Sequence, residues 1–266
     1  MDLLEHEKPA VEILNALGLM IEKIQENSIS KTCDFRISND TSPVLIEHKS
    51  RNEDEDFIRD LQTRKIVSRT RPLYRSNRIA NIVKEAVKQL DSLGHQGNEV
   101  KLLWFSLLFF PDPEVAYDQI FATVYGSSGI VHIDTTGKAI STDCLYFNHS
   151  SFHRYPQLAG VIIDQPKGLT FFKNNFSPMI QSLEHLRLYC TFDSDGGVFK
   201  PHEAEKNGAI FIADTDEDRN DRNLILAYIK NKYRLKYAYN IEPQSHEAYT
   251  RIPRNSPKRP KSSDEN

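Results

Sequence analysis

The chain has 266 residues, 39% of them hydrophobic and 27% charged, with a formal net charge of −3 at pH 7. This composition is typical of a globular protein that can bury a substantial core, in one large or two small domains. It excludes a uniformly basic polymer-binding chain, so any cationic binding face must be local. We expect no membrane span and no signal peptide, and the three widely spaced cysteines favour a reducing, cytoplasmic location.

The first predicted element is an amphipathic helix that begins near Pro9, a residue suited to a first helical turn. Its apolar stripe at helical spacing consists of Ala10, Leu14, Leu17, Ile21 and Ile24. Extended backwards by three or four residues, the stripe reaches Glu7. Glu12 falls outside the stripe and should face solvent. The helix dipole by itself also favours a carboxylate at Glu7.

Two strands joined by a turn are predicted in residues 33–49, which read CDFRISNDTSPVLIEHK. Asp34 lies at the start of the first strand, and Glu47 and Lys49 lie near the end of the second. Residues two apart in a strand point to the same face, so these two project together while His48 points the other way. If the strands pair as a hairpin, Asp34 comes beside Glu47.

Two carboxylates and an ammonium at one end of a sheet suit metal-assisted phosphodiester hydrolysis. The carboxylates can hold Mg²⁺, which keeps several waters and takes further ligands from substrate phosphates. The metal activates a water and offsets phosphate charge, and the lysine positions that water or stabilises developing charge. The alternative is a hairpin with ordinary surface charges, because this short pattern also arises by chance.

The order of elements around Asp34, Glu47 and Lys49 strengthens the catalytic interpretation. A helix, a strand with the aspartate, a strand ending in Glu-His-Lys and a later helix resemble the PD-(D/E)XK, or restriction-endonuclease-like, nuclease superfamily. The resemblance covers about residues 1–175, and Cys33 stands at the superfamily's nominal proline position. It implies a mixed sheet flanked by helices.

The resemblance also implies further site residues. Superfamily members often place a glutamate at the beginning of the first helix, which corresponds to Glu7 as a third metal ligand with Asp34 and Glu47. They often carry a glutamine or lysine on the second helix, which corresponds to Gln89, whose other interpretation is simple polar flanking. The implied cofactor is Mg²⁺, with Mn²⁺ able to substitute.

A basic stretch precedes the second helix, which we expect over residues 79–90. Its six cations, with no acid between them, are Arg64, Lys65, Arg69, Arg71, Arg75 and Arg78. Contacts to nucleic-acid phosphates would use such a cluster. A solvated loop that balances the acidic run at residues 53–56 is the other interpretation. The nearby motif favours phosphate contacts.

The rest of the chain predicts an α/β fold with a central mixed β-sheet flanked by helices and a C-terminal α/β extension. We expect a nuclease-like core over residues 1–177, an extension over 178–252 and a disordered tail over 253–266. Further elements are expected as strands at 100–110, 129–133, 145–147, 158–163, 169–172, 208–213 and 235–240, and as helices at 114–125, 179–189 and 224–233.

Two other patterns resemble metal sites. The segment 214–218 (DTDED) resembles the start of an EF-hand loop, but Arg219 and Ile225 stand where that loop needs glycine and glutamate. We therefore expect an acidic turn. His149 and His153 have helical ligand spacing with Cys144 upstream, but no fourth zinc ligand is evident, which favours ordinary histidines.

The sequence thus predicts a Mg²⁺-dependent endonuclease that acts on nucleic acid. DNA is favoured over RNA only because most members of the superfamily that the chain resembles act on DNA. Restriction or phage defence is a compatible role, with a homo-oligomer or a partner protein of a defence system as further expectations. Two alternatives stay open. One is an inactive nuclease-fold protein that binds nucleic acid or a partner protein, and the other is an unrelated α/β binding module with an accidental motif.

Overall fold

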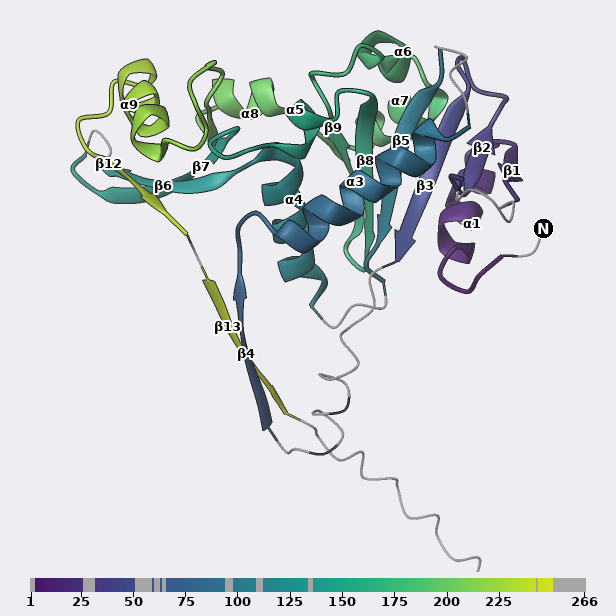
Figure 1. Ribbon diagram of the computed structural model, residues 1–266, viewed down its shortest axis with the longest axis horizontal. Coiled ribbons are helices and arrows are strands. Elements are labelled where there is room, and N and C mark those ends of the chain that lie inside the picture. Colours follow the sequence, from purple (N-terminus) through teal and green to yellow (C-terminus); the bar gives the residue numbers. More distant parts are fainter. Residues whose placement is uncertain are drawn as a thin grey trace, which may run out of the picture.

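The computed structural model describes residues 3–25, 32–50, 59, 63, 66–93, 98–108, 112–133, 136–242 and 244–250, with only the backbone given for 66–72 and 244–250. These residues form an α/β fold with two main sheets (Figure 1). The predicted fold class is therefore confirmed. The expected tail over 253–266 lies outside the described residues.

The larger sheet is mixed and has seven strands. In spatial order these are β1 (Ile21–Lys23), β2 (Phe35–Ile37), β3 (Val44–Ser50), β5 (Val100–Ser106), β8 (Leu158–Gln165), β9 (Gly168–Lys173) and β10 (Val198–Phe199). Strands β1, β2 and β3 pair antiparallel, whereas β3, β5 and β8 run parallel. Strands β5 and β8 are buried along nearly their whole length, as expected for central parallel strands.

Each face of this sheet is covered by helices (Figure 1). Apolar residues of α3 (Asn77–Asp91) and α4 (Pro113–Tyr125) pack on one face, with Leu45, Leu103 and Val161 among their partners. The opposite face packs against α1 (Lys8–Ala16) and α7 (Arg187–Ser194), with α6 (Ile180–Glu184) preceding α7. Glu47 and Lys49 belong to the α3 face, because they alternate with Ile46 and His48 along β3.

A second sheet has four strands in the order β11 (Ile210–Ile212), β7 (Ala139–Leu145), β6 (Ser128–Ile133) and β12 (Ala238–Ile241). Helix α9 (Arg222–Lys232) packs on it, and α8 (Pro201–Lys206) precedes β11. The short α5 (Ser151–Arg154) contacts α4. Strands from both sides of residue 177 enter both sheets, so the expected boundary there does not coincide with the division between sheets.

A two-stranded ribbon, β4 (Ile66–Pro72) with β13 (Gln244–Thr250), extends away from both sheets (Figure 1). The two strands pair antiparallel over their full length. The ribbon therefore joins the basic stretch before α3 to the segment that follows β12.

Several predicted boundaries were wrong. Helix α1 ends at Ala16 because Gly18 takes a left-handed φ of 68°, so Ile21 belongs to β1 rather than to the helical stripe. The strand expected at 145–147 is the end of β7, which stops where Tyr146 has a φ of 57°. Strand β5 ends at Ser106, before the expected residue 110.

The helix expected at 179–189 is two helices, because Leu186 has an extended backbone. The Asp40 carboxylate accepts hydrogen bonds from the backbone N–H groups of Arg187 and Leu188, at 2.8 and 3.2 Å, and so caps α7 from a distant loop. A cap supplied from 147 residues away leaves no local signal in the sequence.

Candidate active site

The predicted hairpin forms, and its register places Asp34 beside Glu47. Phe35 is opposite Ile46 in the β2–β3 ladder, so the residue before Phe35 faces the residue after Ile46. Asp34 immediately precedes β2, and its Oδ2 accepts a 2.7 Å hydrogen bond from the backbone N–H of His48. The backbone of β3 thus fixes the aspartate next to the glutamate.

Glu47 is fully buried, with 0% of its surface exposed. Burial, and then the like charge of Asp34, raise the pKa of Glu47 to about 8. Its Oε2 atom receives no hydrogen bond from a donor group of the described residues. A hydrogen bond shared with the Asp34 carboxyl also favours the protonated form of Glu47. Burial also raises the pKa of Asp34. Two adjacent carboxyl groups that resist ionisation are a place where a cation would be strongly favoured.

Lys49 joins the Glu47 carboxyl to α3. Its Nζ lies against Glu47 Oε1, where it forms an ion pair when Glu47 is ionised, and it donates a hydrogen bond of 2.9 Å to Gln89 Oε1. The parallel pairing of β3 with β5 and the packing of α3 on this face bring Gln89 to Lys49 across 40 residues of sequence. The structure therefore brings together Asp34, Glu47, Lys49 and Gln89.

His48 points to the opposite face of β3, as strand alternation predicts. Its ring stacks on that of His6, with 5.5 Å between centroids, and burial lowers its pKa to about 3. The imidazole is therefore neutral at physiological pH. His48 contributes its backbone N–H to the site, not its side chain.

Glu7 lies at the beginning of α1 and is 2% exposed, whereas Glu12 is exposed, as the helix phasing predicts. Glu7 Oε2 pairs with Lys23 Nζ at 2.5 Å and accepts a 2.8 Å hydrogen bond from the Leu4 N–H. Its negative charge contributes to raising the pKa of Asp34, which places it near the two carboxyls. Sequence reasoning missed Lys23, because nothing local marks it as a partner of Glu7.

The pair formed by Asp34 and Glu47 fits a hard divalent cation. The buried Oε2 of Glu47, which receives no hydrogen bond from a described donor group, and the raised pKa of both carboxyls are the observations that support this. Across the described parts of the chain, no three His, Cys, Asp or Glu side chains converge closely enough to form a metal centre. Any cation here would therefore take further ligands from water and substrate, as Mg²⁺ commonly does.

An open hollow of about 580 Å³ adjoins Lys49. Its other lining residues lie along one side of α3 and are Asn77, Arg78, Asn81, Ile82 and Glu85. Sequence reasoning identified Arg78 but missed the two asparagines. Their only signal was the polar side of an amphipathic helix, which most helices share.

The structure describes only part of the basic stretch. Arg64 and Lys65 lie outside the described residues, and Arg69 and Arg71 lie on β4, for which only the backbone is described. In the ribbon, Arg69 is opposite Glu247 of β13. These four residues therefore stay predictions as phosphate contacts.

Arg75 and Arg78 lie next to the start of α3. Arg75 donates from Nε to the His149 carbonyl oxygen at 3.2 Å and from Nη1 to Asn77 Oδ1 at 2.7 Å. Arg78 is exposed and lines the hollow. Both lie on the α3 side of the sheet that carries Lys49.

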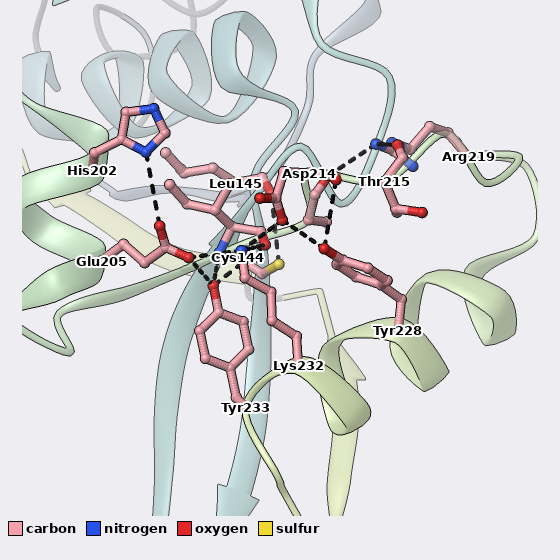
Figure 2. A network of polar contacts seen from close by, with 12 residues as sticks. Cys144, Leu145, His202, Glu205, Asp214, Thr215, Arg219, Tyr228, Lys232 and Tyr233 are labelled. Atoms are coloured by element: carbon pink, nitrogen blue, oxygen red, sulfur yellow. Dashed lines mark hydrogen bonds and ion pairs between the residues drawn. The ribbon is translucent and has the colours of Figure 1, made fainter.

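The second sheet holds a separate polar cluster, shown in Figure 2. Lys232 pairs with Asp214 at 2.5 Å and with Glu205 at 2.8 Å, while Tyr228 and Tyr233 donate to the same two carboxylates. The two carboxylates thus share the Lys232 ammonium and accept hydrogen bonds, which is typical of a structural network that ties α8 and β11 to α9. Asp214 opens the DTDED segment, which forms the expected turn between β11 and α9.

The three residues considered for zinc do not meet. Cys144 is buried, with its thiol directed to the Leu145 carbonyl at 3.6 Å. His149 bonds to Asn220, and the His153 ring packs on Phe176. Each of these side chains thus has its own contacts.

Comparisons with protein-family profiles, curated proteins and solved structures found no match. Among the described helices, none combines the length and the apolar character needed to cross a bilayer. The case for a function therefore rests on the geometry of the site.

Proposed function

We propose that this protein is a Mg²⁺-dependent nuclease of the PD-(D/E)XK type. The observation that carries the proposal is the placement of Asp34 beside buried Glu47, with Lys49 held between Glu47 and Gln89. Helix α1, the β2–β3 hairpin and α3 also follow one another in the order that the resemblance implies, with β1 and β4 as additional strands between them.

Each side chain has a role that its contacts support. Asp34 and Glu47 would hold the cation, which when bound supplies a water of lowered pKa and offsets the charge of the phosphate. Gln89 accepts a hydrogen bond from Lys49 and so fixes the direction of its ammonium group. Lys49 then orients the attacking water or stabilises the charge that develops on the phosphate. The hollow beside Lys49 leaves room for substrate.

The test is cleavage of DNA and RNA, single-stranded and duplex, by the purified protein with Mg²⁺, Mn²⁺ or EDTA. We expect metal-dependent cleavage that Asp34→Ala, Glu47→Ala and Lys49→Ala each abolish. Because the three residues act as one unit, double variants should be little worse than single ones. Circular dichroism and thermal melting establish that each variant is folded.

Glu12→Gln is the matched control, since Glu12 is an exposed carboxylate on α1. Full cleavage by the Lys49→Ala protein would overturn the assignment of the site. Binding of nucleic acid without cleavage under any metal condition would instead favour the inactive, binding-only alternative.

A further inference from the structure

The hollow beside Lys49 runs lengthwise along one side of α3. Its lining residues Asn77, Asn81 and Glu85 are spaced four apart and therefore form one stripe of the helix. Gln89, the partner of Lys49, continues that stripe by one more turn. From Asn77 to Gln89 the helix rises by about 18 Å, at 1.5 Å per residue. An elongated substrate could therefore lie along α3 from the Lys49 end to the beginning of the helix.

Two arginines stand at the far end of this stripe. Arg75 is bonded to Asn77, which lines the hollow, and to the His149 carbonyl. These contacts fix the guanidinium but do not neutralise it. Arg75 contacts the carbonyl of His149, and Arg154 follows five residues later as the exposed last residue of α5. The charge of Arg154 also lowers the pKa of Arg75, after the larger effect of burial.

Neither arginine forms an ion pair with a described acidic residue. A bound anion would offset the positive charge of the two guanidinium groups, and a phosphate suits them because guanidinium groups bind phosphate oxygens with paired hydrogen bonds.

We propose that the hollow along α3 is the path of the cleaved strand, and that Arg75 and Arg154 together hold one of its phosphates several nucleotides from the cut. This inference rests on the proposed nuclease function and adds the direction of the strand and a remote anchoring site. One strand of B-form DNA advances roughly 3.4 Å per nucleotide, so about 18 Å corresponds to roughly five nucleotides. Arg154, Asn77 and Asn81 become binding residues.

The experiment measures binding of fluorescently labelled DNA and RNA by anisotropy, with Ca²⁺ replacing Mg²⁺ and at several salt concentrations. The variants are Arg154→Gln, Arg75→Gln and the double variant. Arg234→Gln is the matched control, because Arg234 is exposed and lies beyond α9, at the second sheet. Arg154→Gln keeps the test valid if Arg75→Gln disturbs folding, since the Arg154 side chain is exposed.

Substrates are shortened one nucleotide at a time from each side of the mapped cut. We expect each arginine variant to weaken binding of long substrates and to reduce the slope of log affinity against log salt by about 0.7–0.9. On one side of the cut only, substrates that extend less than roughly five nucleotides should bind the variants and the wild type with equal affinity.

Unchanged salt slopes, or equal losses for the shortest and the longest substrates, would overturn this inference. If the wild-type protein still cleaves in that case, the proposed nuclease function survives. A wild-type protein that neither binds nor cleaves any of these substrates would remove both.

Discussion

At the scale of single residues, Glu47 is the most strongly perturbed group of the candidate site. Its carboxyl is buried beside Asp34, and its pKa of about 8 lies above the value of 4.5 for an exposed glutamate. Between about pH 4.5 and pH 8, the metal-free folded protein therefore keeps the Glu47 carboxyl protonated, whereas the unfolded chain releases that proton. Ionising Glu47 in the folded state costs stability, and the cost grows from about pH 4.5 until it levels off near pH 8.

This cost predicts the pH dependence of stability. In EDTA, the free energy of unfolding of Glu47→Gln minus that of the wild type should rise between pH 4.5 and pH 8, by on the order of 3–5 kcal/mol. Saturating Mg²⁺ should reduce the difference at pH 8, because the cation stabilises only the ionised wild-type site. Urea denaturation at each pH measures this difference in the free energy of unfolding, with Glu12→Gln as the control. A difference that does not vary with pH would contradict the buried, protonated carboxyl.

Glu7 allows a second prediction at this scale. Glu7→Gln should lower cleavage activity and apparent metal affinity, whereas Glu12→Gln should change neither, because only Glu7 is buried near Asp34. A Mg²⁺ titration of cleavage compares the two variants. Lys23→Met removes the 2.5 Å ion pair of the Glu7 carboxylate. It therefore separates an effect of Glu7 on metal binding from an effect on the folding of α1. The reverse order of the two glutamates would mean that Glu7 serves only the folding of α1.

At the scale of elements, α3 serves both the core and the candidate site. Its buried residues, including Ile79, Val83 and Val87, pack on the sheet, while Gln89 and the polar stripe face Lys49 and the hollow. Ser76 caps the helix by accepting a hydrogen bond from the Ile79 N–H, so its beginning is fixed next to Arg75.

The end of α4 gives the sharpest prediction about an element. Gly126 ends this helix with a φ of 64°, and a Cβ there would lie 2.3 Å from the backbone oxygen of Asn148. Gly126→Ala should therefore destabilise the protein by about 2–5 kcal/mol, from left-handed strain plus the clash. Gly137→Ala is the control, because Gly137 has a φ of 85° but open space around it, and it should lose only about 1–2 kcal/mol. Urea denaturation compares them, and equal losses would show that the contact with Asn148 relaxes freely.

At the scale of the whole molecule, the chain passes repeatedly between its two sheets. It leaves the larger sheet after α4 to form β6 and β7, returns for β8, β9 and β10, and leaves again for β11 and β12. The last strand, β13, then pairs with β4, which precedes α3. The segment after β12 is thus tied to the basic stretch rather than to the second sheet.

Local patterns in the sequence were enough to determine the α/β class, the helices near 79–90 and 114–125, and the pairing of Asp34 with Glu47. These features depend on periodicity and on a short hairpin, where the interacting residues are close in sequence. Lys49 and Glu47 are two residues apart in a strand and therefore point to the same face, whereas His48 between them points to the opposite face.

Only the tertiary structure decided the rest. The bond from Lys49 to Gln89 spans 40 residues, and the Asp40 cap that splits α6 from α7 spans 147. The ion pair of Glu7 with Lys23 and the hydrogen bond from Arg75 to the His149 carbonyl likewise depend on how whole elements pack. Such contacts form when distant surfaces meet, and their energies leave no periodic trace in the sequence. For that reason the sequence could identify the candidate carboxylates Asp34 and Glu47, but not the hollow beside Lys49.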